Sequence, residues 1–218
     1  MHKIMLVDDH PVFRNGLKTL ITSDPDFEVV AETDNTSEAF GLYESLKPDI
    51  CVVDVTLKDS SGLDLVKTIR DRHSDAKILV LSMHSEDFYA ERALKAGAKG
   101  YVMKEQASED IINALRAIAK DQIYLSQRMM NRLFSKTYGQ KKDLSLSPID
   151  SLTDRELEVL QMISDGKSVK EIAFALGLSH KTVETHRSHI MHKLGIGTSN
   201  ELLQFAIHWK IDHQAKNA

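Results

Sequence analysis

The sequence contains few of the features that mark secreted or membrane-embedded proteins. Its 218 residues include one cysteine, Cys51, which excludes an intramolecular disulfide and a four-cysteine zinc site and fits a reducing compartment. The start of the chain shows no basic stretch followed by an apolar run. No segment approaches the ~20 consecutive apolar residues that a membrane-spanning helix needs. We therefore expect a cytoplasmic protein without a signal peptide.

The chain also lacks a large excess of either charge, with 28 basic and 32 acidic residues and a formal net charge of −4. The charges are, however, unevenly distributed. Residues 1–125 hold 15 basic and 22 acidic side chains, whereas residues 126–149 hold 5 and 1. Such a change along the chain predicts two units with different partners.

Short apolar runs alternate with amphipathic stretches over the first 120 residues. The runs are continuous and rich in β-branched residues, which is typical of strands buried on both faces of a parallel sheet. We place strands at 4–7, 29–31, 50–53, 78–81 and 101–103, and helices at 11–22, 36–46, 62–72, 86–96 and 107–119. Ser37 and Ser108 are the predicted starts of two helices, and Gly97 is a predicted stop. The pattern indicates an α/β fold with a doubly wound, five-stranded parallel sheet.

Three aspartates stand at the ends of predicted strands. Asp8 and Asp9 follow the first strand, and Asp54 ends the third. In a doubly wound sheet these ends are neighbours, so the carboxylates would repel one another unless a cation neutralised them, and oxygen ligands favour Mg²⁺. Ser82 and Lys104 follow the next two strands and complete a ring that suits phosphoryl transfer onto Asp54. A single aspartate at a strand end often only caps a helix, but five suitable residues at four strand ends favour a shared site.

The same residues lie in motifs of a known family. The motifs are Val7-Asp8-Asp9-His10-Pro11, Val53-Asp54-Val55, Gly62, Leu81-Ser82 and Gly100-Tyr101-Val102-Met103-Lys104. Residues 1–122 resemble a response-regulator receiver domain (CheY-like), and the Asp-Asp-His-Pro variant resembles the NarL/FixJ subfamily. The resemblance implies that Asp54 is the phosphoacceptor and that Mg²⁺ is the cofactor. It implies these further roles: Asp9, Asp54 and the main-chain carbonyl of Thr56 bind Mg²⁺, Asp8 assists, and Ser82 and Tyr101 form a switch pair, with Lys104 at the phosphoryl group.

The C-terminal part of the sequence has the signals of a small helical domain. Capping-box signatures start three helices at Thr153-x-x-Glu156, Ser168-x-x-Glu171 and Thr198-x-x-Glu201. Within residues 168–194, a turn at Gly177-Leu178-Ser179 separates two helices with the spacing of a helix-turn-helix, whose second helix can enter the major groove of DNA. An ordinary amphipathic hairpin shares this pattern, so the residue types must distinguish the two.

Those residue types resemble the LuxR-type DNA-binding domain over residues 149–213. The matching motifs are Leu152-Thr153-x-Arg155-Glu156, Lys170-Glu171-Ile172-Ala173, Leu176-Gly177-Leu178-Ser179 and Thr182-Val183-Glu184-x-His186. The resemblance implies an all-α domain of four helices that forms a homodimer through its last helix, about residues 200–212. It implies base contacts from Glu184, Thr185 and Ser188 and DNA-backbone contacts from Lys181, Thr182, Arg187 and Lys193. Glu184 departs from the lysine that is frequent at this position.

The two resemblances together predict a transcription factor made of a receiver (1–122), a linker (123–148) and a helix-turn-helix domain (149–218). A partner histidine kinase would phosphorylate Asp54 and so control dimerisation and binding to double-stranded DNA. We expect no enzyme activity beyond self-phosphotransfer onto Asp54 and slow autodephosphorylation. One alternative is a LuxR-type factor with a vestigial receiver that acts without phosphorylation. A Mg²⁺-dependent phosphohydrolase with an aspartate nucleophile would instead have an Asp-x-Asp pair after the first strand.

Overall fold

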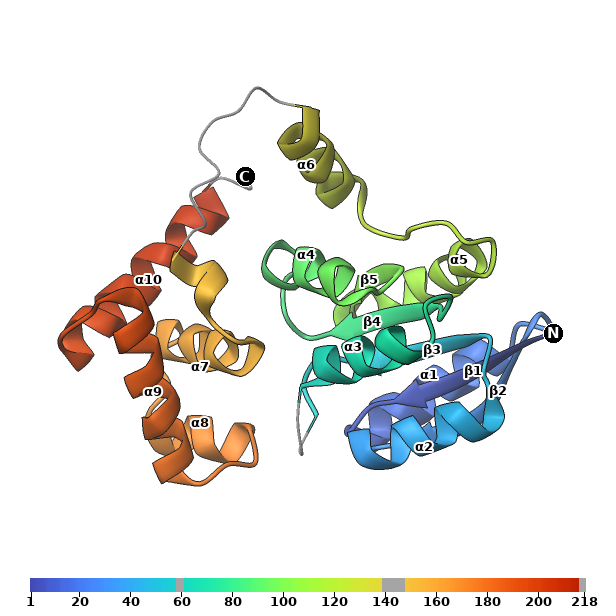
Figure 1. The fold of residues 1–218 in the computed structure, drawn as a ribbon, viewed down its shortest axis with the longest axis horizontal. Helices are drawn as coiled ribbons and strands as arrows, with labels where there is room; N and C mark the ends of the chain where they lie inside the picture. Colours follow the sequence, from blue (N-terminus) through green and yellow to red (C-terminus); the bar gives the residue numbers. More distant parts are fainter. Residues whose placement is uncertain (58–60, 139–147, 216–218) are drawn as a thin grey trace. The chain divides into compact units, whose positions relative to one another are not determined.

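The computed structural model describes residues 1–57, 61–138 and 148–215, which form two compact units (Figure 1). The first unit is Met1–Gly139 and the second is Gln140–Ala218. The division falls inside the linker predicted at 123–148, because a helix within that linker belongs to the first unit. Among the described residues, no helix combines the length and the apolar character needed to cross a membrane.

The first unit is built on a parallel sheet with the strand order β2-β1-β3-β4-β5. The strands are β1 (His2–Val7), β2 (Phe27–Thr33), β3 (Ile50–Asp54), β4 (Ile78–Ser82) and β5 (Gly100–Met103). The doubly wound, five-stranded sheet predicted from the sequence is therefore confirmed. Val7 pairs with Val53, Asp54 with Leu81, and Ser82 with Met103. This register brings the carboxyl ends of four strands together at one edge of the sheet.

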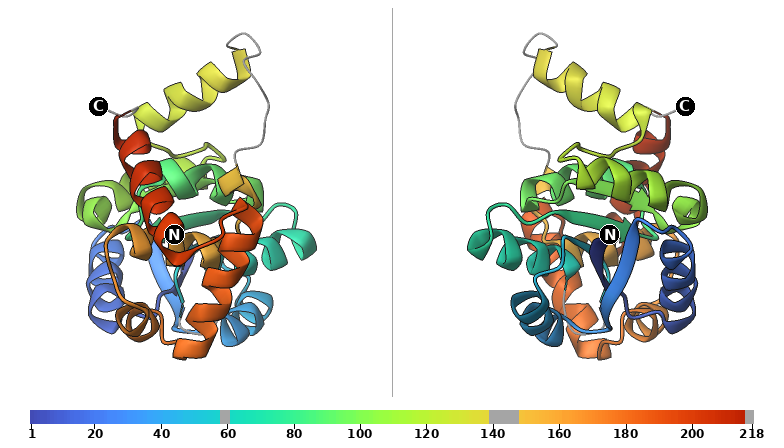
Figure 2. Two further views of the ribbon diagram at one scale, coloured as in Figure 1. Left: turned by 90° about the vertical axis from the view of Figure 1, so that its left-hand side faces the viewer. Right: turned by 90° about the vertical axis from the view of Figure 1, so that its right-hand side faces the viewer.

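Helices cover both faces of the sheet (Figures 1 and 2). They are α1 (Pro11–Thr22), α2 (Thr36–Leu46), α3 (Gly62–Arg72), α4 (Glu86–Ala96) and α5 (Ala107–Ala119), and α6 (Gln127–Tyr138) follows them. Helices α1 and α5 pack together on one face, and α2, α3 and α4 pack in sequence on the other. Ile4 and Leu6 are fully buried in the core beneath α1 and α5, where they meet Leu17 and Ile111. Burial on both faces explains why the strands appear in the sequence as continuous apolar runs.

Helices α2 and α5 have the predicted bounds, but neither begins at the serine predicted as its start. Helix α2 starts at Thr36 because the side chain of Asn35 accepts a hydrogen bond from the Glu38 N–H at 2.8 Å, so Ser37 is not its cap. Helix α5 starts at Ala107, directly after a 3₁₀ turn at Lys104–Gln106, so Ser108 does not cap it. The predicted stop at Gly97 is confirmed, since this residue has a left-handed φ of 104°.

The second unit consists of α7 (Asp154–Ser164), α8 (Val169–Ala175), α9 (His180–Leu194) and α10 (Ser199–Ala215), preceded by a 3₁₀ turn at Pro148–Ser151. All three predicted capping boxes form, with reciprocal hydrogen bonds between the hydroxyl-bearing residue and the glutamate. Gly177 has a φ of +63° in the turn between α8 and α9, a conformation that few other residues adopt. Ser179, the last residue of the predicted turn, caps α9.

Candidate functional site

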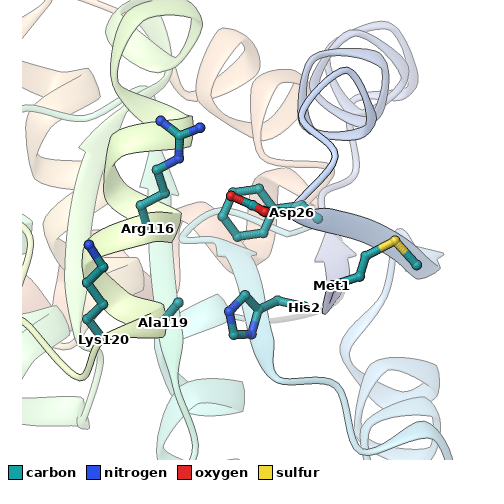
Figure 3. A pocket seen from close by; sticks show the side chains of 7 residues that line it. Met1, His2, Asp26, Arg116, Ala119 and Lys120 are labelled. Atoms are coloured by element: carbon teal, nitrogen blue, oxygen red, sulfur yellow. The ribbon is translucent and has the colours of Figure 1, made fainter.

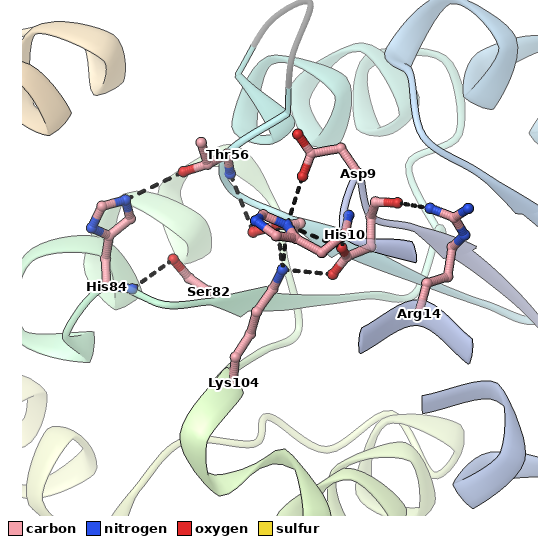
Figure 4. A network of polar contacts seen from close by, with 9 residues as sticks. Asp9, His10, Arg14, Thr56, Ser82, His84 and Lys104 are labelled. Carbon is pink, nitrogen blue, oxygen red and sulfur yellow. Dashed lines mark hydrogen bonds and ion pairs between the residues drawn. The ribbon is translucent and has the colours of Figure 1, made fainter. Parts of the chain in front are cut away.

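The carboxyl ends of β1, β3 and β5 place three charged side chains in direct contact (Figure 4). The ammonium of Lys104 lies 2.6 Å from Asp54 Oδ2 and 2.7 Å from Asp8 Oδ2. All three residues are nearly inaccessible, with exposed fractions of 6%, 2% and 3%. Buried charges of this kind need partners. The single positive charge of Lys104 cannot neutralise three carboxylates, namely Asp8 and Asp54, which it contacts, and the neighbouring Asp9.

His10 also belongs to this site. Its Nδ1 lies 2.7 Å from Asp9 Oδ1, 3.4 Å from Asp8 Oδ1 and 3.7 Å from Asp54 Oδ2. The hydrogen bond with Asp54 raises the pKa of His10 above its ordinary value, although burial opposes the shift. Burial raises the pKa of Asp9, and the positive charge of His10 opposes that change. In the sequence, His10 stood out only as part of a motif, and no role was predicted for it.

The pocket fits a divalent cation. Asp8 Oδ2 and Asp9 Oδ1 are buried and accept no hydrogen bond from the described residues, although each lies close to a positively charged group. Asp8, Asp9, His10 and Asp54 each offer a donor atom, and these atoms all lie within 4.8 Å of one another. Three carboxylates, one ammonium, one dication and a neutral His10 imidazole sum to zero charge. A hard, oxygen-preferring ion such as Mg²⁺ suits the carboxylates.

A hydrogen-bonded chain leads from the pocket to His84, which lies just before helix α4, and Figure 4 shows the contacts of Thr56, His84 and Ser82. The main-chain N–H of Thr56 donates to Asp54 Oδ1 at 3.2 Å, and its hydroxyl contacts His84 Nε2 at 3.2 Å. The N–H of His84 donates to Ser82 Oγ at 3.0 Å, and its carbonyl accepts from the hydroxyl of Tyr101 at 2.7 Å. The Tyr101 side chain is buried, with 2% of the residue exposed, and this burial raises its pKa. Ser82 and Tyr101 are thus joined through His84, for which the sequence predicted no role.

Helix α6 is tied to the first turn of α4 by ion pairs. Arg128 lies 2.8 Å from Asp87 Oδ2 and 3.5 Å from Glu86 Oε1, and Arg132 lies 3.1 Å from Asp87 Oδ1. Met129, between the two arginines, is 1% exposed. The N-terminal half of the predicted linker therefore packs as part of the first unit.

A second polar surface lies on α9 of the C-terminal unit. Val183 and Ile190 are fully buried, and Leu194 is half-buried, so one side of α9 faces the core as predicted. The seven residues predicted to contact DNA are exposed or half-buried; they are Lys181, Thr182, Glu184, Thr185, Arg187, Ser188 and Lys193. Three of them form ion pairs within the unit, because Arg187 lies 3.2 Å from Glu184 and Lys193 lies 2.6 Å from Glu156 of α7.

Comparisons with known protein families support both units. Residues 4–116 match the response regulator receiver domain, and residues 150–206 match the luxR family of bacterial regulatory proteins. Oxygen regulatory protein NreC of Staphylococcus aureus is 35% identical over 213 residues, which are 96% of this chain and 98% of NreC. The chain belongs to the NarL/FixJ family of response regulators.

Other relatives agree with this assignment. The nitrate/nitrite response regulator protein homolog of Haemophilus influenzae is 36% identical over 196 residues, covering 89% of this chain and 90% of that protein. The structure of RcsB from Salmonella enterica serovar Typhimurium, bound to a promoter with phosphomimetic BeF3-, has a TM-score of 0.60 and 25% identity. It covers 94% of this chain and 98% of that one. This response regulator is therefore a DNA-binding protein of the LuxR type with a receiver domain.

One further pocket lies at the opposite end of the sheet of this regulator (Figure 3). It measures about 360 Å³ and lies between the starts of β1 and β2 and the end of α5. Its lining includes His2, Asp26, Phe27, Arg116 and Lys120. Arg116 is paired with Asp24 at 2.7 Å. The pocket contains none of the aspartates at the carboxyl ends of the strands.

In the DNA-binding unit of this regulator, the Lys193–Glu156 pair stabilises the packing of α9 on α7. Burial raises the pKa of Glu156, but the hydrogen bonds from Lys193 and Thr153 outweigh it, and the net shift is downward. A carboxyl group with a lowered pKa stabilises the fold above its unfolded pKa of about 4.5, and this contribution is lost as pH falls through the folded value.

We predict that Glu156→Gln lowers the free energy of unfolding of the C-terminal unit by about 1–3 kcal/mol at pH 7. Glutamine keeps an acceptor for the cap but loses the charge that faces Lys193. The difference from wild type should shrink below about pH 4, where the glutamate is increasingly protonated. Denaturant unfolding followed by the fluorescence of Trp209, the one tryptophan, measures this unit alone.

Glu184→Gln is the matched control, because Glu184 is exposed and its pair with Arg187 lies on the surface. We expect it to change stability by less than about 0.5 kcal/mol at either pH. Equal effects of the two substitutions, or a Glu156→Gln effect that does not depend on pH, would contradict the assigned role of the Glu156–Lys193 pair.

Proposed function

We propose that this regulator controls transcription through phosphorylation of Asp54 by a partner histidine kinase, acting in the cytoplasm. The observation that carries the proposal is the contact of one buried lysine with Asp54 and Asp8 in a chain that also holds a LuxR-type helix-turn-helix. A receiver that had lost its function would have no need to retain this costly cluster of buried charges.

In the proposed reaction, a carboxylate oxygen of Asp54 attacks the phosphorus of a phosphohistidine. The P–N bond breaks, and the leaving imidazole takes up a proton. The ammonium of Lys104 is placed to balance the charge on the phosphoryl oxygens, and Asp9, Asp54 and the Thr56 carbonyl would hold Mg²⁺, with Asp8 assisting. The ion would supply further positive charge for the transferred group. No activity on other substrates is proposed, apart from slow loss of the phosphoryl group.

The hydrogen bonds that join Asp54, Thr56, His84 and Tyr101 couple the state of Asp54 to the position of the linker. The phosphoryl group adds about 1.5–2 negative charges beside Ser82 and Thr56. If the Ser82 hydroxyl turns to that group, it gives up the hydrogen bond from the His84 N–H. His84 lies two residues before α4, whose first turn is paired with Arg128 and Arg132 of α6. A shift at His84 therefore biases the position of α6, from which the linker continues.

Dimerisation through α10 is part of the proposal. Leu203, Ile207 and Ile211 recur at every fourth position and are 38%, 39% and 54% exposed. They lie apart from Leu202, Ala206 and Trp209, which are buried in the core of the unit. A second copy of α10 would cover this apolar stripe. The α9 helices of the two copies would then bind the two halves of a symmetric DNA site. In structures of RcsB, dimers are bound to DNA.

DNA binding by the full chain provides the test. Duplexes are first selected from a random pool, and affinity is then measured with and without Mg²⁺ and a small phosphodonor such as acetyl phosphate, at fixed salt. We expect the phosphodonor to raise affinity at least about tenfold for wild type and not at all for Asp54→Ala. If wild type and Asp54→Ala bind DNA with equal affinity, both with and without the phosphodonor and Mg²⁺, the proposal is refuted. A LuxR-type factor that acts without phosphorylation would then be favoured.

A further inference from the structure

The imidazole of His10 distinguishes this acidic pocket from one made only of oxygen ligands. Nitrogen is a poor ligand for Mg²⁺, which prefers oxygen at near-ideal octahedral geometry. Imidazole suits zinc and its neighbours in the transition series, and affinities for such sites rise from manganese towards copper. A histidine that points into three carboxylates therefore changes which ions the pocket can select.

The distances around His10 match those between ligands of a single ion. With metal–ligand bonds of about 2.0–2.2 Å, two donor atoms lie about 2.9 Å apart at right angles and about 3.4 Å apart in a tetrahedron. The His10 Nδ1 atom lies 2.7 Å, 3.4 Å and 3.7 Å from carboxylate oxygens of Asp9, Asp8 and Asp54. The four donor atoms lie within 4.8 Å of one another, so the carboxylates must close in on an ion that binds all four. The Lys104 ammonium, 3.4 Å from His10 Nδ1, must move aside as the ion enters.

We propose that a transition-metal dication of the zinc type binds this pocket with His10 as a ligand, in competition with Mg²⁺. The oxygens of Asp54 are then engaged by an ion that also holds the imidazole across the pocket mouth. His10 is the most exposed member of the cluster, with 58% of its side chain accessible. An imidazole fixed at this position obstructs the approach of a phosphodonor. Zinc then acts as an inhibitor of Asp54 phosphorylation, whereas Mg²⁺ supports it.

Paired titrations of the full chain test the ligand role of His10. Zn²⁺ affinity is measured by competition with a chromophoric chelator and Mg²⁺ affinity by calorimetry, for wild type and His10→Asn. We expect His10→Asn to weaken Zn²⁺ binding at the pocket at least about tenfold and to change Mg²⁺ affinity less than about twofold. Unchanged Zn²⁺ affinity, or an equal loss for both ions, would overturn the proposal.

Other histidines require a matched control. His186, His189 and His192 lie on α9 at intervals of three residues and are a second possible source of zinc binding. His189→Asn should therefore leave the affinity of the pocket unchanged, whereas Asp54→Asn should weaken it. Because His10 is largely exposed, His10→Asn is expected to fold. His10→Gln provides a second variant, and circular dichroism checks both. A pocket affinity that falls with His189→Asn and not with His10→Asn would place the zinc on α9 and refute the proposal.

Phosphorylation supplies an independent readout at the same residue. With Mg²⁺ and a labelled phosphodonor, we expect Zn²⁺ to block labelling of wild type at concentrations that leave His10→Asn labelled. The proposal depends on the pocket proposed for phosphorylation, but not on phosphoryl transfer itself. If Asp54 is labelled and Zn²⁺ inhibits the labelling of wild type and His10→Asn equally, only the proposed zinc site is refuted. Absence of labelling in Mg²⁺ alone would instead refute the proposed function, and the titrations would still decide the metal ligand.

Discussion

Asp54→Asn is expected to reduce the uptake of label from a phosphodonor by roughly three orders of magnitude or more. The asparagine side chain has nearly the same shape but lacks the anionic oxygen that attacks phosphorus in the proposed reaction. Asp8 and Asp9 remain beside it, so the experiment also asks whether a neighbouring carboxylate can replace the nucleophile. Incubation with Mg²⁺ and labelled acetyl phosphate, followed by mass spectrometry of the intact chain, measures the result.

Asp71→Asn is the matched control, because Asp71 is an exposed aspartate on α3 outside the pocket. It should be labelled as fully as wild type. Peptide mass spectrometry locates the label in wild type. Label on Asp8, Asp9 or any side chain other than Asp54 in the wild-type protein would show that the third strand does not carry the phosphoacceptor.

The sheet and its pocket could be predicted from the sequence, because apolar runs and their order along the chain determine the overall arrangement of the strands. Continuous apolar runs such as Ile50–Val53 identify strands covered on both faces. Parallel strands have their carboxyl ends at the same side of the sheet, so Asp54, which ends β3, lies near Asp8 and Lys104, which directly follow β1 and β5. In the structure, the Lys104 ammonium lies within 2.7 Å of both carboxylates. Here periodicity and topology are sufficient.

The roles of His10 and His84 do not follow from the same features. Each lies in a short loop after a strand, where the direction of a side chain depends on local φ and ψ rather than on a repeat. For His10, the one signal in the sequence was its position directly after Asp8 and Asp9. The α4–α6 contact also had a signal, since Arg128 and Arg132 share a helix face and Glu86 and Asp87 are adjacent acids. Arg128 and Asp87 are, however, 41 residues apart, and a single sequence does not show which distant charges form a pair.

The pocket depends on one glycine as strongly as on its charged groups. A Cβ atom at Gly62 would lie 1.8 Å from the main-chain oxygen of Asp54 and 2.9 Å from its carbonyl carbon. These are backbone atoms of the strand end, so neither can rotate away. The N–H of Gly62 also donates to the carbonyl of Val55 at 2.7 Å, which fixes the start of α3 against β3.

Gly62→Ala is therefore expected to cost about 3 kcal/mol or more and to lower the melting temperature of the first unit by about 10 °C. It should also reduce labelling of the remaining folded protein, because Asp54 must shift to relieve the contact. Gly41→Ala is the opposite case, since Gly41 lies in α2, where an added Cβ would meet no atom within 4 Å, and it should gain about 0.5–1 kcal/mol. Calorimetry of the full chain measures both effects. Equal melting temperatures of Gly62→Ala and wild type would contradict this prediction. They would show that the backbone of Asp54 can move away from residue 62 at little cost in free energy.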